Sequence, residues 1–160
     1  MAGTALALSE HFRQAKLYTV EPDGLDDTAR SLATGKRQTN DPSARSICDA
    51  IVTPSPGLLT FPIVQSKAAG GKVVTDEEAL SAMKTAWDYF KLTVEPGGAV
   101  ALAASLKQEV IASHTATNAR LLLLYSLEAT VIRIYLRRPW PPLLSSSHLL
   151  AAHTAGITVK

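Results

Sequence analysis

Two carboxylates in the stretch VEPDGLDD stand on either side of a short polar loop. Glu21 ends a predicted strand, Asp27 opens the next predicted helix, and the loop between them offers the backbone carbonyl of Leu25. Carboxylate and carbonyl oxygens are hard ligands suited to Mg²⁺, Mn²⁺ or Ca²⁺. The neighbouring Asp23 and Asp26 are expected to lie in solvent. The alternative is an acid-rich helix start that binds no metal and interacts only with the helix dipole.

A second candidate site is the sequence EPGG, residues 95–98, ahead of a run of Ala, Val and Leu. Its proline suits the first turn of a helix, which residues 99–104 can propagate. Two adjacent glycines cost about 1 kcal/mol each relative to Ala in a helix. Gly97 and Gly98 therefore predict that a backbone segment or a ligand comes close. Glu95 either belongs to such a site or only caps the helix near its positive end.

Other reactive side chains build no recognisable site. The segment SSSHLLAAH contains serines and histidines but has no nucleophile elbow or carboxylate partner, which argues against a hydrolase triad. Cys48 is flanked by Ile47 and Asp49 and is expected to be a small buried residue rather than a nucleophile. A single cysteine also excludes an intramolecular disulfide and a pair of cysteine metal ligands.

The composition indicates one globular domain with a sizeable core, since 46% of the 160 residues are hydrophobic. The net charge is only +2, and no basic cluster is interleaved with aromatics, so nucleic acid is not an expected partner. The apolar run LLLLYSLEATVIRIYL contains Glu128 and Arg133 and is shorter than the ~20 residues that a membrane span needs. No secretory signal is recognisable in the first eight residues, and we expect a cytoplasmic protein.

The elements that would position the two candidate sites alternate between helix and strand, which indicates an α/β fold. Apolar periodicity and turn residues predict helices over 2–14, 26–35 and 58–71 and a strand over 15–22. The helix over 26–35 has acids in its first turn and Gly35 at its end. The helix over 58–71 is expected to close at Gly70 and Gly71.

An amphipathic helix is predicted over TDEEALSAMKTAWDYFKL, residues 75–92. Thr75 can cap its start while Glu78, three residues on, reaches back to the cap. One face of the helix is predicted to enter the core and consists of Leu80, Met83, Trp87 and Phe90.

Four segments, in this order, resemble the C-terminal half of the catalytic region of threonine/serine dehydratases: VEPDGLDDTARSL, ARSICDAIVTPSPGLLTFPIV, VVTDEEALSAM and KLTVEPGGAVALAA. The resemblance covers about residues 2–109 and extends to serine racemase, within the tryptophan-synthase-β-like class of pyridoxal-phosphate enzymes. It implies part of a three-layer α/β fold, here truncated. It also implies β-elimination of a hydroxy amino acid to a 2-oxo acid and ammonia, with the cofactor as electron sink.

The resemblance also assigns roles to the two candidate sites. It implies that Glu95 lies beside the cofactor ring and that Gly97 and Gly98 let the backbone approach it. It implies further that Glu21, the carbonyl of Leu25 and Asp27 hold Mg²⁺, Mn²⁺ or Ca²⁺.

The chain departs from the family pattern at both ends. The Ser-Phe-Lys and Ser-Gly-Asn-His motifs have no counterpart, and the four-glycine phosphate loop is expected just before residue 1. The Schiff-base lysine is therefore absent, no catalytic residue is assigned, and pyridoxal phosphate is not expected to bind this chain alone. We expect a partial dehydratase-like catalytic domain over 1–110. Residues 111–160 are expected to form a non-family tail, an apolar segment followed by a Pro/Ser-rich stretch, that does not join the sheet as a central strand.

Two functions remain open at this point. The first is a fragment of a threonine/serine dehydratase that is inactive alone and takes a hydroxy amino acid substrate only when completed. The second is a non-catalytic truncated or degenerate domain that binds a divalent cation or associates with an intact family member. Self-association through exposed apolar surface is compatible with both.

Overall fold

The computed structural model describes residues 1–13, 15–107, 121–125, 131–134 and 157–159. Its helices, strands and short helical turns, in chain order, are α1 (Ala2–His11), β1 (Lys16–Pro22), α2 (Asp27–Thr34), η1 (Asp49–Ile51), α3 (Phe61–Lys67), β2 (Gly70–Val74), α4 (Asp76–Thr85), η2 (Ala86–Phe90), α5 (Pro96–Leu106), β3 (Leu121–Tyr125), β4 (Val131–Ile134) and β5 (Ile157–Val159). The predicted α/β fold class is confirmed.

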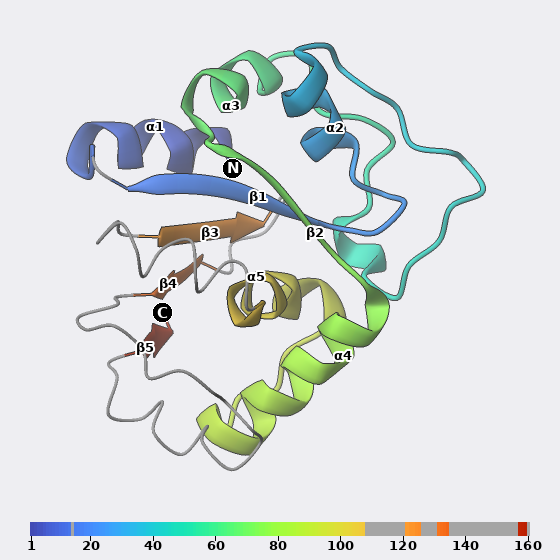
Figure 1. Cartoon of the computed structure of the whole chain (residues 1–160), viewed down its shortest axis with the longest axis vertical. Coiled ribbons are helices and arrows are strands. Elements are labelled where there is room, and N and C mark those ends of the chain that lie inside the picture. The colour runs from blue at the N-terminus through green and yellow to red at the C-terminus, as the bar shows by residue number, and fades with distance from the viewer. Residues whose placement is uncertain (14, 108–120, 126–130, 135–156, 160) are drawn as a thin grey trace.

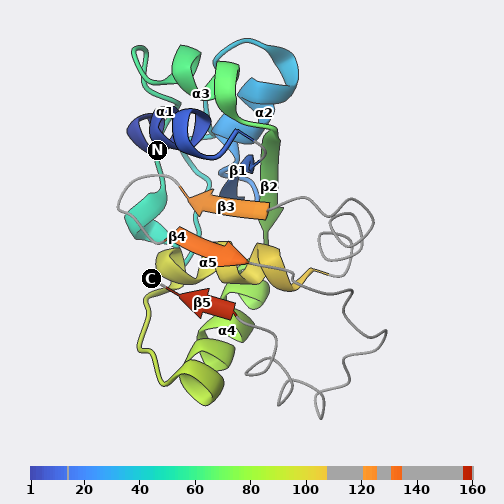
Figure 2. The same ribbon diagram turned by 90° about the vertical axis from the view of Figure 1, so that its left-hand side faces the viewer.

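One five-stranded sheet organises the chain, with strand order β2-β1-β3-β4-β5. β1 pairs in parallel with β2 on one side and with β3 on the other, whereas β4 and β5 pair antiparallel. Figure 2 shows β3, β4 and β5 lying side by side. β1 is buried from Thr19 to Pro22, as expected for a strand covered on both faces.

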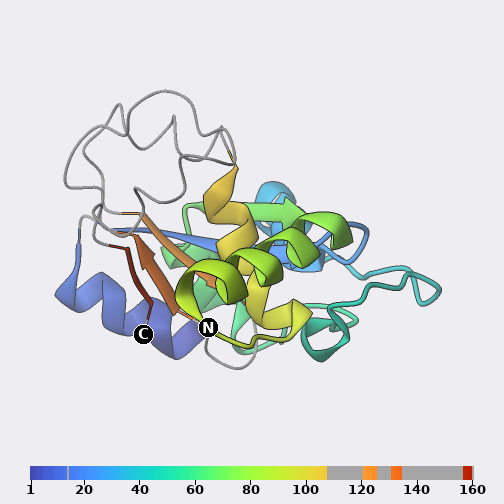
Figure 3. The same cartoon turned by 90° about the horizontal axis from the view of Figure 1, so that it is seen from below.

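Helices cover the sheet on both faces (Figure 1). α1, α2 and α3 lie on one face, and α5 packs against the other. α4 packs on the outer side of α5, as the view from below also shows (Figure 3). The small residues of α5 are buried from Ala99 to Ser105, so this helix can approach both the sheet and α4 closely.

The structure confirms the residues that were predicted to begin or end three of the helices. Gly35 ends α2 in the left-handed conformation, with φ of 72°. Thr75 and Glu78 form the predicted capping box of α4: the Thr75 hydroxyl accepts from Glu78 N–H, and Thr75 N–H donates to the Glu78 carboxylate. Pro96 occupies the first turn of α5.

The prediction that Gly70 and Gly71 close a helix is wrong. α3 ends at Lys67, and the two glycines begin β2. The reason is a close approach of α2 to this strand, since a Cβ atom on Gly71 would lie 2.4 Å from Cβ of Ala29. Gly71, which reads as part of a helix stop, is here required by close packing in the tertiary structure.

The predicted buried face of the helix over 75–92, which the structure divides into α4 and η2, is wrong in two of its members. Leu80 is 52% exposed and Trp87 is 59% exposed, although Met83 does pack against the core. The buried positions are instead the alanines 79, 82 and 86. α4 meets α5, whose surface consists of small residues, so the two helices come together through alanines rather than through large side chains.

The expectation that the tail does not enter the sheet is contradicted by β3. Leu121–Tyr125 pairs in parallel with β1 and antiparallel with β4, which places it centrally. Its sequence, LLLLY, is the continuous apolar run typical of a strand covered on both faces. Residues 121–125 of the predicted tail therefore belong to the sheet, and the predicted division of the chain near residue 110 stays a prediction. The Pro/Ser-rich stretch lies outside the described residues.

Candidate functional site

The junction between β1 and α2 brings the two predicted metal-ligating carboxylates back to one region. β1 ends at Pro22, Leu25 N–H donates to the Pro22 carbonyl at 3.1 Å, and Gly24 takes φ of 73°. The chain thus turns sharply before α2 begins at Asp27. The turn lies at the carboxyl end of a parallel strand, where α/β sheets commonly place their sites.

Glu21 is buried at this junction, with only 3% of the residue exposed. Its two carboxylate oxygens accept the backbone N–H groups of Thr28, at 3.0 Å, and Ala29, at 2.8 Å, in the first turn of α2. Burial raises the pKa of Glu21 from 4.5 to about 7, although these hydrogen bonds oppose the shift. The charge of the nearby Asp27 raises this pKa further.

Asp27 is 1% exposed, and only one of its two carboxylate oxygens has a hydrogen-bond partner among the described residues. Its Oδ1 accepts from the Asn40 side-chain amide at 2.6 Å, whereas Oδ2 has no hydrogen-bond partner among the described residues. Burial raises the pKa of Asp27 as well. A buried carboxylate oxygen without a partner is costly, and either a proton or a cation would relieve that cost.

The donor set at this junction fits a hard divalent cation. Glu21 and Asp27 supply carboxylates, and Leu25, itself 3% exposed, is held in the intervening turn. In the described part of the chain, no three or more His, Cys, Asp or Glu side chains cluster as metal ligands. A cation here would therefore take the Leu25 carbonyl and water as its further ligands. Of the two acids expected in solvent, Asp23 is exposed and Asp26 pairs with Arg30 at 3.1 Å.

The second candidate site, at the start of α5, has a different character. Glu95 is exposed, and its side chain makes no capping hydrogen bond to the first turn. A Cβ atom on Gly97 would lie 2.9 Å from Cγ2 of Ile51 in η1, so an internal contact already requires a glycine there. That Glu95, Gly97 and Gly98 contact a cofactor remains a prediction.

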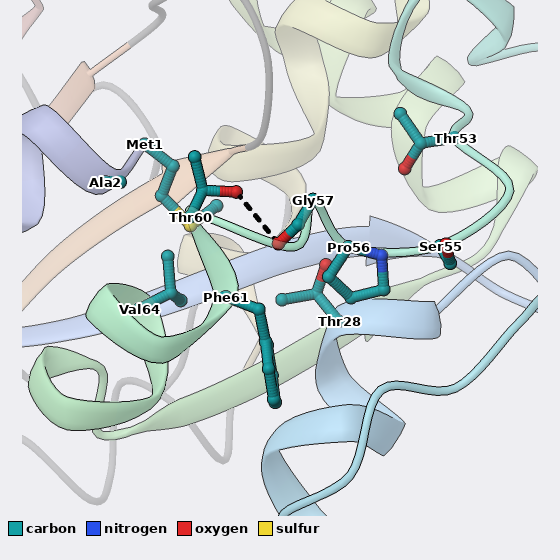
Figure 4. A pocket seen from close by; sticks show the side chains of 10 residues that line it. All are labelled: Met1, Ala2, Thr28, Thr53, Ser55, Pro56, Gly57, Thr60, Phe61 and Val64. Atoms are coloured by element: carbon teal, nitrogen blue, oxygen red, sulfur yellow. Dashed lines mark hydrogen bonds between the residues drawn. The ribbon is translucent and has the colours of Figure 1, made fainter.

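A cavity of about 190 Å³, which the sequence did not reveal, opens between the start of α1, the start of α2 and α3 (Figure 4). Its lining residues are Met1, Ala2, Thr28, Thr53, Ser55, Pro56, Gly57, Thr60, Phe61 and Val64. Thr28 connects it with the first site, because the N–H of this residue donates to Glu21. The segment TPSPG, residues 53–57, is the part of the sequence that could have signalled a ligand-facing loop.

The chain is similar in sequence to members of one enzyme family. A model of the pyridoxal-phosphate dependent enzyme family matches residues 1–126. The serine racemase of Dictyostelium discoideum is 39% identical over 110 residues, which are 68% of this chain and 34% of that protein. The L-threo-3-hydroxyaspartate ammonia-lyase of Pseudomonas sp. is 36% identical over 111 residues, with the same coverage. The chain spans about a third of the length of these relatives.

Solved structures extend the similarity to the fold. A threonine deaminase from T.th. matches with a TM-score of 0.67 and 32% identity, over 78% of this chain and 40% of that one. Maize serine racemase matches with a TM-score of 0.60 and 27% identity, over 78% of this chain and 45% of that one. The expected tryptophan-synthase-β-like fold is confirmed. No helix among the described residues is long and apolar enough to cross a membrane.

Proposed function

Because the chain belongs to the family of pyridoxal-phosphate dependent enzymes, we propose that it is a piece of a threonine/serine dehydratase. The complete enzyme would convert a hydroxy amino acid into a 2-oxo acid and ammonia. The observation that carries this proposal is the similarity of one segment to both a serine racemase and a hydroxyaspartate ammonia-lyase. When bound, the cofactor supplies an electron sink for the carbanion left by loss of the substrate's α-proton.

The residues of this chain would contribute positioning to that reaction. Glu95 immediately precedes the first turn of α5 and is exposed. It would therefore be accessible to the ring of a cofactor bound by the rest of the enzyme. α5 behind it is buried from Ala99 to Ser105, which holds Glu95 on a rigid support. Gly98 follows in the first turn and presents no side chain to obstruct a ligand.

The chain alone should hold no cofactor in a lysine linkage. Lys67 and Lys84 are exposed, and the hydrogen bond of Lys84 to Asp88 raises the pKa of its amine, which makes the amine a poor nucleophile. The test is to incubate the chain with pyridoxal phosphate, reduce with borohydride, and map adducts by mass spectrometry. Stoichiometric labelling of one lysine, together with release of 2-oxo acid from serine or threonine, would contradict the proposal.

Completion of the chain provides the positive test. The N-terminal part of the Dictyostelium discoideum serine racemase, up to the start of the similar segment, can be fused ahead of residue 1, and the part of that protein after the similar segment can replace residues 111–160. We expect the fusion to bind pyridoxal phosphate and to release 2-oxo acid from threonine or serine. A Glu95→Ala fusion should fold but lose most of this activity. A well-folded fusion that binds the cofactor but turns over neither amino acid would refute the dehydratase assignment.

We also propose that Glu21, the Leu25 carbonyl and Asp27 hold a divalent cation such as Mg²⁺, Mn²⁺ or Ca²⁺. The unpartnered Oδ2 of buried Asp27 supports this assignment. Calorimetric titration with Mn²⁺ should show a binding heat that the Asp27→Asn variant loses. The Asp23→Asn variant is the matched control, because Asp23 is an exposed acid of the same loop. Equal heats from all three proteins would remove the site.

A non-catalytic, cation-binding domain is the alternative function, and it shares the observation on Asp27. The two functions differ in the fusion experiment. A domain that binds Mn²⁺ as the isolated chain, but gives an inactive fusion, would favour the alternative.

A further inference from the structure

Asn40 is a buried side chain that neither the sequence nor the similarity to other proteins draws attention to. It lies in the loop between α2 and η1 and is 6% exposed. Its amide nitrogen donates to Asp27 Oδ1 at 2.6 Å and to the Thr53 carbonyl at 2.9 Å. Its amide oxygen accepts from Arg30 Nη2 at 2.5 Å.

These contacts determine which way the amide of Asn40 faces. The guanidinium of Arg30 can only donate, so it requires the amide oxygen on its side. The carboxylate of Asp27 and the carbonyl of Thr53 can only accept, so they require the amide nitrogen. The backbone is held as well, because Asn40 N–H donates to the Pro54 carbonyl at 2.9 Å.

The hydrogen bond from Asn40 also restricts the orientation of the Asp27 carboxylate. A carboxylate with one oxygen held by a rigid donor cannot rotate freely, and here the other oxygen, Oδ2, is left without a partner among the described residues. We propose that Asn40 is a positioning residue of the cation site, which holds Asp27 so that Oδ2 faces the cation. This inference rests on the cation site of the proposed function. Residues that orient a metal ligand in this way commonly change affinity when they are removed.

The same contacts connect the cation site with the cavity. Thr53, whose carbonyl accepts from Asn40, lines the cavity, as does Thr28, whose N–H donates to Glu21. Glu21 is thus one hydrogen bond away from the cavity wall, and Asp27 is connected to it through the amide of Asn40.

The test compares Mn²⁺ affinity, measured by electron paramagnetic resonance of free Mn²⁺, in the wild-type chain, Asn40→Ala and Gln38→Ala. Gln38 is a matched control: it is a neutral amide of the same loop, and its side chain donates to Thr34 Oγ1 and the Lys36 carbonyl but to neither carboxylate. Neither substitution changes the charge. We expect Asn40→Ala to bind Mn²⁺ about tenfold to a hundredfold more weakly, and Gln38→Ala to bind like the wild type. Thermal unfolding without metal establishes that each variant is folded.

The outcomes separate the inference from the proposal on which it rests. A wild-type chain that binds no Mn²⁺ removes the cation site itself, and with it the inference. Wild-type affinity in Asn40→Ala, or an equal loss in Gln38→Ala, overturns the inference alone. If Asn40→Ala does not fold, nuclear magnetic resonance of the wild-type chain decides. The side-chain amide resonances of Asn40 should shift on addition of Mg²⁺, and their constancy in a chain that binds Mg²⁺ would refute the positioning role.

Discussion

Gly97 and Ile51 are in such close contact that a Cβ atom added to the glycine would lie 2.9 Å from Cγ2 of the isoleucine. The contact joins the start of α5 to η1, and both residues are buried. Gly97 is therefore required by packing within the chain, whatever ligand approaches the neighbouring Glu95.

This contact predicts the outcome of Gly97→Ala. Crowding against Ile51 costs about 1–3 kcal/mol, and the better helix propensity of alanine returns part of it. We expect a net loss of about 1–2 kcal/mol in the free energy of unfolding, measured by urea titration. Adding Ile51→Leu, which lacks the Cγ2 methyl, should recover part of the loss. The control is Gly3→Ala in α1, where nothing lies within 4 Å of the added carbon, so stability should rise slightly. Strictly additive effects of Gly97→Ala and Ile51→Leu would contradict the contact.

Stability should depend on pH through Glu21. Its pKa is about 7 in the folded chain against an ordinary value of 4.5, so the folded state keeps a proton that the unfolded state has lost. The stabilisation is complete below pH 4.5 and is lost as the pH rises to about 7, by roughly 3 kcal/mol. The raised pKa of Asp27 acts in the same direction.

Urea titrations in chelator between about pH 4.5 and 7.5 would measure this effect. The Glu21→Gln variant should show a much shallower decline, because the amide does not titrate. If Glu21 and Asp27 hold the proposed cation, saturating Mn²⁺ should reduce the decline in the wild type, because the bound cation would stabilise the ionised carboxylates. A wild type and a Glu21→Gln variant with the same pH profile would show that Glu21 does not carry the dependence.

The capping box of α4 predicts a measurable local effect. Thr75→Ala removes the acceptor for Glu78 N–H and should cost about 1 kcal/mol in unfolding free energy. Thr75→Ser keeps the hydroxyl and should remain near the wild type. An equal loss in the two variants would indicate that packing of the threonine methyl group, rather than capping, is the cause.

Leu80 in α4 and Trp87 in η2 are exposed, so we expect the fold to tolerate charged side chains at these two positions. Leu80→Lys and Trp87→Lys together should change the unfolding free energy by no more than about 0.5 kcal/mol, because both side chains are more than half exposed. Ala82→Leu is the contrasting variant, since Ala82 is 1% exposed and overpacking costs about 1–3 kcal/mol. A large loss from the two lysines would mean that another surface covers this face. Sedimentation of the wild type and the double variant would then test self-association.

Features that depend on neighbouring residues could be predicted from the sequence alone. The capping box joins Thr75 to Glu78, and the αL end of α2 depends on Gly35. Glu21 and Asp27 stand on either side of one short turn, so their return to one junction is a local property as well. In each case the hydrogen bond or backbone angle forms within a few residues, where residue type strongly biases the conformation.

Features that depend on which element packs against a given residue or helix face were decided only by the tertiary structure. The sequence could not show that Gly71 faces Ala29, that Gly97 faces Ile51, or that β3 enters the sheet beside β1. Asn40 has no distinctive local pattern, and its proposed role depends on contacts with Asp27 and Thr53 that only the fold creates. α4 buries alanines rather than Leu80 because it packs on a helix of small residues. Periodicity tells which residues share a face, but close packing against a particular neighbour selects the face that is buried.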